Sequence, residues 1–207
     1  MPIFFQHQVN EITRLGIWKI EENEDFFKNN VPLHRDVTHP HKRLQHLAGR
    51  FLLQFLFPDF PYELIQIADT RKPFLPGEQY HFSISHCGDY AAAIVSRTSR
   101  VGIDVEIATE KIERIAGKFL SEAEAKMFNI QYSTLNVQLL TTLWSAKEAV
   151  FKWYGEGGVD FREHTRLSPG SDGEMMKCFF AKTNTELLIH YRNFDQLALA
   201  WVNSDNR

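Results

Sequence analysis

The 207 residues of this chain suffice for one large domain or two small halves around a sizeable core. Hydrophobic residues make up 43% and charged residues 24% of the sequence, and the formal charge of −3 speaks against a general nucleic-acid binder, whose surface is usually basic. Only Cys87 and Cys178 are present, which excludes a disulfide framework, and no segment resembles a signal peptide or a bilayer span, so we expect a cytoplasmic protein without membrane contact.

The first predicted helix covers residues 39–57, where apolar side chains recur at helical spacing and Pro58 follows as a stop signal. The recurring residues are Leu44, Leu47, Ala48, Phe51, Leu52 and Phe55. After a turn-rich segment, residues 80–85 and 90–96 have the composition of two strands, and residues 86–89 are suited to the turn of a hairpin.

The second half begins with a predicted strand over residues 101–107. Ser121, followed by Glu124, forms a capping-box pattern that predicts the start of a helix. A longer helix follows, which Gly155 ends, and residues 176–202 are typical of three short strands. The apolar stripe of the longer helix consists of Leu139, Leu143, Ala146, Val150 and Trp153.

The two halves follow a similar plan, because each has a long amphipathic helix, a turn-rich connection and a closing hairpin. The segment "GDYAAAIVS" in the first half resembles "FDQLALAWV" in the second, although chance similarity of two generic units remains an alternative. We therefore predict an α+β fold of two similar halves, residues 1–98 and 99–207, related by a pseudo-twofold axis with the site between them. A cleft shared within one chain makes a monomer the expected state.

Two acidic residues interrupt the apolar strand "VGIDVE", residues 101–106. Asp104 and Glu106 are two positions apart, so both side chains point to one face of the strand. The simpler interpretation is a solvated edge strand. The alternative is a site for a hard cation such as Mg²⁺, which prefers carboxylate oxygens and keeps water ligands that a phosphate can replace.

Charged residues also occur on the helix of "LWSAKEAVFKWYGEG", residues 143–157, and we expect Lys147, Glu148 and Lys152 to lie off its apolar stripe. Glu148 and Lys152 have the spacing of an ordinary surface ion pair, worth only a few tenths of a kcal/mol. Together with Asp104 and Glu106, however, Glu148 could complete a metal site, and Lys152 could neutralise a phosphate bound there.

Basic and polar residues of the first half would suit the same anion. Arg43, Arg50 and Lys72 could pair with phosphate oxygens, and Ser85 and His86 could donate further hydrogen bonds from the hairpin. Each of these residues taken alone is more often simply solvated.

Four segments together resemble the motifs of the 4'-phosphopantetheinyl transferases: "RKP" (71–73), "SISHCGDYAAAI" (83–94), "VGIDVE" (101–106) and "WSAKEAVFKWYGEG" (144–157). Their order and spacing resemble the larger, single-chain, pseudo-dimeric group, which includes the surfactin-synthetase activators. The resemblance covers most of residues 40–160. It implies the fold of that family and transfer of the phosphopantetheine arm of coenzyme A to a serine of an acyl or peptidyl carrier protein, with release of adenosine 3',5'-bisphosphate.

The resemblance also implies roles for individual residues. Metal ligands would be Asp104, Glu106 and Glu148, and the catalytic residues Glu148, Lys152 and Asp104. Residues that hold coenzyme A would be Lys72, Ser85, His86 and Lys152, with Arg43 as the best match near the 3'-phosphate and Arg50 as the second choice. Either Glu148 or a water held by Glu106 could accept the serine proton. Cys87→Ser is expected to have little effect.

Carrier proteins are usually acidic with a few apolar contacts, so residues 110–128 are the predicted docking platform. Lys111, Arg114, Lys118 and Phe119 would face the partner, although an ordinary amphipathic helix is the simpler interpretation. Two rival functions use the same residues. One is a non-catalytic module that binds coenzyme A or a carrier, and the other is a metal-dependent phosphodiesterase.

Overall fold

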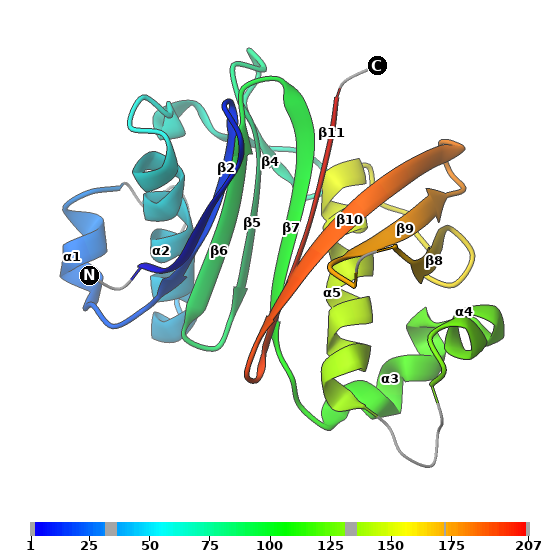
Figure 1. Ribbon diagram of the computed structural model, residues 1–207. Coiled ribbons are helices and arrows are strands. Elements are labelled where there is room, and N and C mark those ends of the chain that lie inside the picture. The colour runs from blue at the N-terminus through cyan, green and yellow to red at the C-terminus, as the bar shows by residue number, and fades with distance from the viewer. Residues whose placement is uncertain (1–2, 32–36, 131–135, 172, 206–207) are drawn as a thin grey trace.

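The computed structural model describes residues 3–31, 37–130, 136–171 and 173–205. Within these ranges the chain forms two large antiparallel sheets that pack against each other and one small two-stranded sheet, and each large sheet has one long helix on its outer face (Figure 1). No helix in these ranges combines the length and apolar character that a bilayer crossing needs.

The first sheet has four strands in the order β1-β2-β6-β5. Their bounds are Ile3–Asn10 (β1), Thr13–Lys19 (β2), Tyr90–Ser96 (β6) and His81–Cys87 (β5). The helix α2, Pro40–Leu56, covers this sheet, and its first turn contains Pro40, a residue favoured there. Two smaller elements contact α2, namely α1 (Glu24–Lys28) and a 3-10 turn (Tyr62–Leu64). The short pair β3 (Gln66–Ile67) and β4 (Pro73–Phe74) follows, and β4 contacts β5.

The second sheet has five strands in the order β7-β11-β10-β9-β8. Their bounds are Ser99–Ile107 (β7), Leu197–Asp205 (β11), Thr185–Phe194 (β10), Met175–Phe180 (β9) and Thr165–Pro169 (β8). The helix α5, Val137–Tyr154, covers this sheet and ends at Gly155, which has the left-handed conformation (φ 76°) that glycine adopts without strain. Two further helices, α3 (Lys111–Phe119) and α4 (Glu122–Met127), precede α5.

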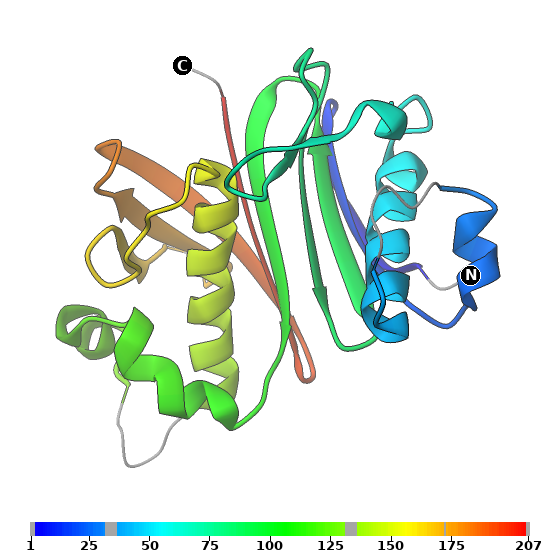
Figure 2. The same ribbon diagram turned by 180° about the vertical axis from the view of Figure 1, so that it is seen from behind.

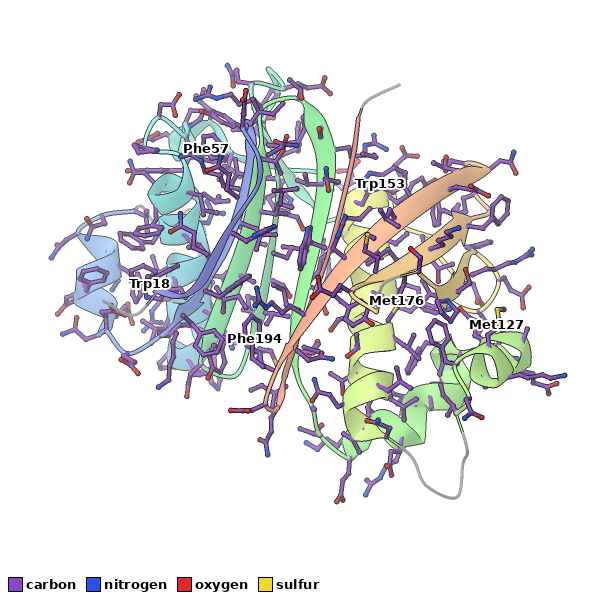
Figure 3. All side chains as sticks on the ribbon, in the orientation of Figure 1. Trp18, Phe57, Met127, Trp153, Met176 and Phe194 are labelled. Carbon is purple, nitrogen blue, oxygen red and sulfur yellow. The ribbon has the colours of Figure 1, made fainter. Side chains whose placement is uncertain are left out.

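Three apolar clusters hold these four layers together. One lies between α2 and the first sheet and a second between α5 and the second sheet; in Figure 3, Trp18 and Phe57 belong to the former and Trp153 and Met176 to the latter. The third cluster lies between the two sheets and includes Ile94 from β6 and Ile103 from β7. Because the sheets share this core, the strand β7 is fixed against the first sheet as well as within the second.

The α+β architecture of two helix-covered sheets confirms the predicted fold class. The predicted helices and the capping box of Ser121 and Glu124 are confirmed as well. The hairpin β1–β2 and the strand β8 were not predicted. The division at residues 98 and 99 falls at the turn between β6 and β7 and stays a prediction.

Candidate functional site

The candidate site lies where the edges of the two sheets meet. The edge strands β5 and β7 lie side by side, but no backbone ladder joins them in the described sheets (Figure 1). Side chains of β5 bridge the gap instead. The Ser83 Oγ accepts the amide of Ile103 at 3.2 Å, and the Cys87 Sγ accepts the amide of Ile107 at 3.4 Å.

The helix α5 lies on the other side of β7, as the view from behind in Figure 2 shows. Gly102 permits this close approach, because a Cβ at this position would lie 2.0 Å from the carbonyl oxygen of Ala149. The residue next to Ala149 is Glu148. The glycine in the strand motif therefore brings the acidic residue of the helix close to Asp104 and Glu106.

Asp104 is the centre of the polar contacts at this seam. Its side chain is 3% exposed, and its Oδ1 accepts hydrogen bonds from Lys152 Nζ at 2.6 Å and from Ser85 Oγ at 2.8 Å. Lys152 Nζ also donates to Ser85 Oγ at 2.8 Å. The second oxygen, Oδ2, is buried and has no hydrogen-bond partner within the part of the chain that the structure describes. Burying a carboxylate oxygen without a hydrogen-bond donor costs free energy, so we interpret Asp104 Oδ2 as an atom that binds a ligand.

Burial and the negative charge of Asp104 raise the pKa values of the neighbouring acids Glu148 and Glu106. Burial, followed by repulsion from Asp104 and Glu106, raises the pKa of Glu148 to about 7, although Lys152 acts in the opposite direction. Burial and repulsion from Asp104 also raise the pKa of Glu106. Asp104, Glu106 and Glu148 therefore form a region of mutually repelling carboxylates around one ammonium group.

These carboxylates could bind a divalent cation, but their present positions do not form a complete coordination site. Across the described residues, no three His, Cys, Asp or Glu side chains converge closely enough to form one. Asp104 Oδ2 has no hydrogen-bond partner among the described residues, and the pKa values of Glu106 and Glu148 are raised. The three carboxylates can nevertheless supply hard oxygen ligands, and a bound cation would reduce the repulsion between them. The residues thus fit the predicted Mg²⁺, whose presence stays a prediction.

The raised pKa of Glu148 predicts a pH dependence of the metal-free protein. Because the folded-state pKa lies above the ordinary 4.5, this residue stabilises the fold fully below pH 4.5, and that contribution is lost as the pH rises through about 7. In urea unfolding with EDTA between pH 4.5 and 8, Glu148→Gln should therefore gain stability relative to the wild type as the pH rises. An equal pH profile for the two proteins would contradict the shift, and Glu186→Gln, at an exposed position on β10, is the control.

A cavity of about 290 Å³ opens beside Lys152 and extends to the segment around Lys72. Lys72 Nζ donates to the carbonyl oxygen of Trp153 at 3.2 Å, at the C-terminal end of α5. Burial, with a smaller contribution from Arg100, lowers the pKa of Lys72 to about 8. The structure thus brings Lys72 and Lys152 to one cavity, as the nucleotide-binding prediction requires.

The two candidate arginines lie in different surroundings. Arg50 lines a cavity of about 160 Å³ together with His46 and His86, whose rings stand 5.4 Å apart edge to face. Partial burial is the main cause that lowers the pKa of His86. Arg43 instead forms an ion pair with Glu24 of α1 at 2.8 Å and donates to the carbonyl oxygen of Val37. The geometry therefore favours Arg50 over Arg43 as the arginine nearer the other predicted binding residues.

We expected Lys147 to lie off the apolar stripe of α5. This expectation was wrong, because the Lys147 side chain is fully buried. Its Nζ forms an ion pair with Glu124 of α4 at 2.7 Å and donates to the carbonyl oxygens of Phe161 and Thr165. Glu124 also accepts the amide of Leu167 in β8. Lys147 therefore ties α5 to α4 and β8, away from the seam.

The prediction that Phe119 faces a carrier protein was also wrong. It is 1% exposed and packs against Trp144, so it cannot face a partner. Lys111, Arg114 and Lys118 of the same helix are exposed. The exposed apolar side chain nearby is that of Met127 at the end of α4, which is 52% exposed (Figure 3).

Sequence reasoning missed three residues at the seam. Cys87 and Trp144 lie near enough to Glu106 to lower its pKa, against the larger effect of burial, and the Oγ of Ser83 accepts the amide of Ile103 in β7. Ser83, Ser85 and Cys87 alternate along β5, so the period of two in "SISHC" was a signal that all three face the same way. Nothing in the sequence indicated that this face meets β7.

Comparison with known proteins gives a family match over the second half of the chain. Residues 100–202 match the model of the 4'-phosphopantetheinyl transferase superfamily. The enterobactin synthase component D of Salmonella austin is 32% identical over 161 residues, which cover 75% of this chain and 68% of that protein. The 4'-phosphopantetheinyl transferase AcpT of Escherichia coli is 28% identical over 134 residues, covering 61% of this chain and 68% of AcpT.

Other matches are partial. The enterobactin synthase component D of Escherichia coli is 32% identical over 117 residues, so this chain spans about half, 54%, of that relative's length. Among solved structures, the holo-acyl-carrier-protein synthase AcpS of Thermotoga maritima matches with a TM-score of 0.39 and 24% identity, covering 52% of this chain and 63% of that one. A likeness of that size carries no functional weight.

Proposed function

This chain belongs to the 4'-phosphopantetheinyl transferase superfamily, and on that premise we propose that it transfers the phosphopantetheine arm of coenzyme A to a serine hydroxyl of an apo acyl or peptidyl carrier protein. The observation that carries the proposal is the seam itself, where Asp104 holds Lys152 and Ser85 and keeps one buried oxygen unpartnered. An acid-rich site with a lysine suits a diphosphate bound through a cation.

In the proposed reaction, the serine oxygen bonds to the β-phosphorus of coenzyme A, and the bond from that phosphorus to the bridging oxygen breaks. Adenosine 3',5'-bisphosphate leaves. Asp104, Glu106 and Glu148 would hold Mg²⁺, which in this chemistry neutralises charge on the diphosphate oxygens. Lys152 would stabilise the charge that develops on the phosphate oxygens, since Asp104 and Ser85 already fix its ammonium group at the seam.

The serine must lose a proton as it attacks. Glu148 is one candidate acceptor, because its carboxylate lies in the same acidic region as Asp104 and Glu106. A water held by Glu106 is the alternative. Such general base action contributes about 10²–10⁴-fold.

We assign the binding of the nucleotide to one half of the chain and the binding of the cation and the carrier to the other. We assign residues 1–98 to the nucleotide, with Lys72, His86 and Arg50 as the binding residues, and residues 99–207 to the cation and the carrier. Arg43 is the less favoured candidate for the 3'-phosphate because Glu24 already pairs with it. Membership of the single-chain, pseudo-dimeric group, a monomeric state and a cytoplasmic location belong to the same proposal.

The test is incubation with coenzyme A, Mg²⁺ and a panel of apo-carriers, followed by mass spectrometry of the carriers. A mass gain of one phosphopantetheine unit on a serine supports the proposal. Binding of coenzyme A without transfer to any carrier would instead support a non-catalytic module, and Mg²⁺-dependent nicking of plasmid DNA would support a phosphodiesterase.

Docking of an acidic carrier on α3 yields a separate prediction. Replacing Lys111, Arg114 and Lys118 together with alanine should raise the carrier KM about tenfold, the effect of losing three exposed ion pairs of about 0.5 kcal/mol each. The KM for coenzyme A should not change. Lys177→Ala, an exposed position on β9, is the control, and an unchanged carrier KM in the triple variant would remove α3 as the docking surface.

A further inference from the structure

We propose that the chain has a second binding site, a ring-lined cavity on the far side of the molecule from the seam, which takes a small aromatic carboxylate. The cavity has a volume of about 330 Å³ and lies where β1 of the first sheet faces β10 and β11 of the second. In the first sheet, β1 and β5 are the two opposite edges, so the cavity is separate from the seam at β5 and β7. Its volume is at the lower end of the range of small-molecule sites.

Aromatic rings form most of the wall of this cavity. Phe5 and His7 lie two positions apart on β1, so both side chains point to one face of that strand, towards the second sheet. The ring of His7 stands 5.9 Å from that of Trp201 on β11, and the ring of His190 on β10 stacks on Trp201 at 5.5 Å with 15° between the planes. Rings contributed by both sheets suit a planar apolar ligand body.

The indole of Trp201 supplies a hydrogen-bond donor that the protein itself does not use. This residue lines the cavity, is 7% exposed and belongs to the core between the sheets. Its Nε1 is buried and has no hydrogen-bond partner in the part of the chain that the structure describes. Because a buried indole N–H usually has an acceptor, and leaving it unpaired costs free energy, we interpret it as a donor to a polar group of the ligand.

A permanent positive charge lies at the same cavity. The guanidinium carbon of Arg192 lies 5.0 Å from the ring centre of Phe5 and 5.7 Å from that of Phe194, so one ring from each sheet holds it. None of the ion pairs among the described residues involves Arg192. A guanidinium pairs with a carboxylate through two parallel hydrogen bonds, and a carboxylate oxygen is also an acceptor for the Trp201 indole. A carboxylate on a planar body therefore suits the whole wall.

The hairpin positions at this cavity correspond to those at the seam. Ser83 and Ser85 lie four and two residues before the end of β5, and they face the edge strand β7 of the other sheet. His190 and Arg192 lie four and two residues before the end of β10, and they face the edge strand β1. Both hairpins thus present polar groups to the other sheet, but at β10 these groups are basic. A basic wall can bind an anion without a metal ion.

One residue of the lining opposes an anion. Glu174, which precedes β9, also lines the cavity and is exposed. A cationic ligand is therefore the competing interpretation. Such a ligand would lie near the fixed charge of Arg192 and would leave the Trp201 indole without an acceptor, so the carboxylate is favoured. The experiment compares the two charges directly.

The experiment follows the indole N–H signals of protein labelled with nitrogen-15 tryptophan, in NMR spectra recorded at pH 7 without coenzyme A, metal or carrier. The chain has four tryptophans, and the signal that is absent in Trp201→Phe belongs to Trp201. If this variant does not fold, phenylalanine substitutions of the other three assign the signal by elimination. We expect sodium benzoate to shift the Trp201 signal in a saturable way and to leave the other three in place.

Variants at two arginines test the role of the charge. Arg192→Gln should weaken benzoate binding roughly tenfold, because a charge-assisted pair with the carboxylate is lost. Arg166→Gln is the matched control and should bind benzoate as the wild type does. Arg166 is also exposed and lies 6.0 Å from the ring centre of Phe179, but on β8 and outside the cavity. Benzamide, which is neutral, and benzylammonium, which is cationic, should each bind at least roughly tenfold more weakly than benzoate.

Benzoate that shifts no indole signal, or that shifts all four alike, would overturn the inference. Equal weakening in Arg192→Gln and Arg166→Gln would also overturn it, because a general charge effect would then explain the binding. Tighter binding of benzylammonium than of benzoate would show that the cavity prefers a cation and would contradict the assignment. Each of these results leaves the proposed transfer reaction intact, since the assay contains neither coenzyme A nor a carrier.

Discussion

Asp104→Ala is expected to lower kcat/KM for carrier modification by about 10²–10³-fold, the scale seen when one group that stabilises developing charge is removed. The carboxylate supplies the buried, unpartnered oxygen, and it also anchors Lys152 and Ser85. Its loss would remove a proposed cation ligand and release Lys152, the lysine that we propose stabilises the phosphates. Two functions of the site therefore fail together.

The rate of holo-carrier formation, followed by mass spectrometry, measures this effect. Asp104→Asn separates charge from shape, because the amide keeps the size of the side chain, and it should be nearly as inactive as the alanine variant. Glu186→Ala, at an exposed position on β10, should retain full activity. Activity within about threefold of the wild type in both Asp104 variants would contradict the seam as the catalytic centre, since groups of this kind contribute far more.

Lys147→Met is expected to destabilise the protein by roughly 3–5 kcal/mol, the cost of leaving the other member of a buried ion pair without its partner. Glu124 is 2% exposed at its side chain, and Lys147 is its charge partner at 2.7 Å. The carbonyl oxygens of Phe161 and Thr165 would lose a donor at the same time. The effect concerns the fold rather than the chemistry.

Urea unfolding at pH 7 measures this loss as a fall in the midpoint. The double variant Glu124→Leu/Lys147→Met should be less unstable than the sum of the single variants, because no unpaired charge remains in the core. Lys118→Met, an exposed lysine of α3, should change stability by less than about 0.5 kcal/mol. A Lys147→Met protein as stable as Lys118→Met would show that the pair contributes nothing.

Local patterns predicted much of the fold. The capping box at Ser121 and Glu124 located α4, and the glycine at position 155 located the end of α5, because both signals depend on neighbouring residues alone. The alternation in β7 correctly placed Ile103 in the core. The hairpin β1–β2 was missed because its residues alternate weakly, and β1 is largely exposed.

The site was harder to predict where partners come from distant segments. Lys147 and Glu124 lie on different helices, so no spacing rule pairs them. Phe119 is a different case, because Ile112, Ala116 and Phe119 recur at helical spacing and all three are buried. That pattern was available in the sequence and indicated a core position. The contacts of Cys87 with β7 depend on how two sheet edges meet, which no local pattern specifies.

The strand order of the second sheet has a consequence for how the molecule is made. The strand β11 lies between β7 and β10, and its Ala200 pairs with Asp104. During synthesis on the ribosome, β7 therefore leaves the exit tunnel long before the strand that will flank it, and the backbone hydrogen-bonding groups on that edge of β7 stay unpaired until β11 is made. Such a late, long-range closure makes for slow folding and a transient risk of aggregation.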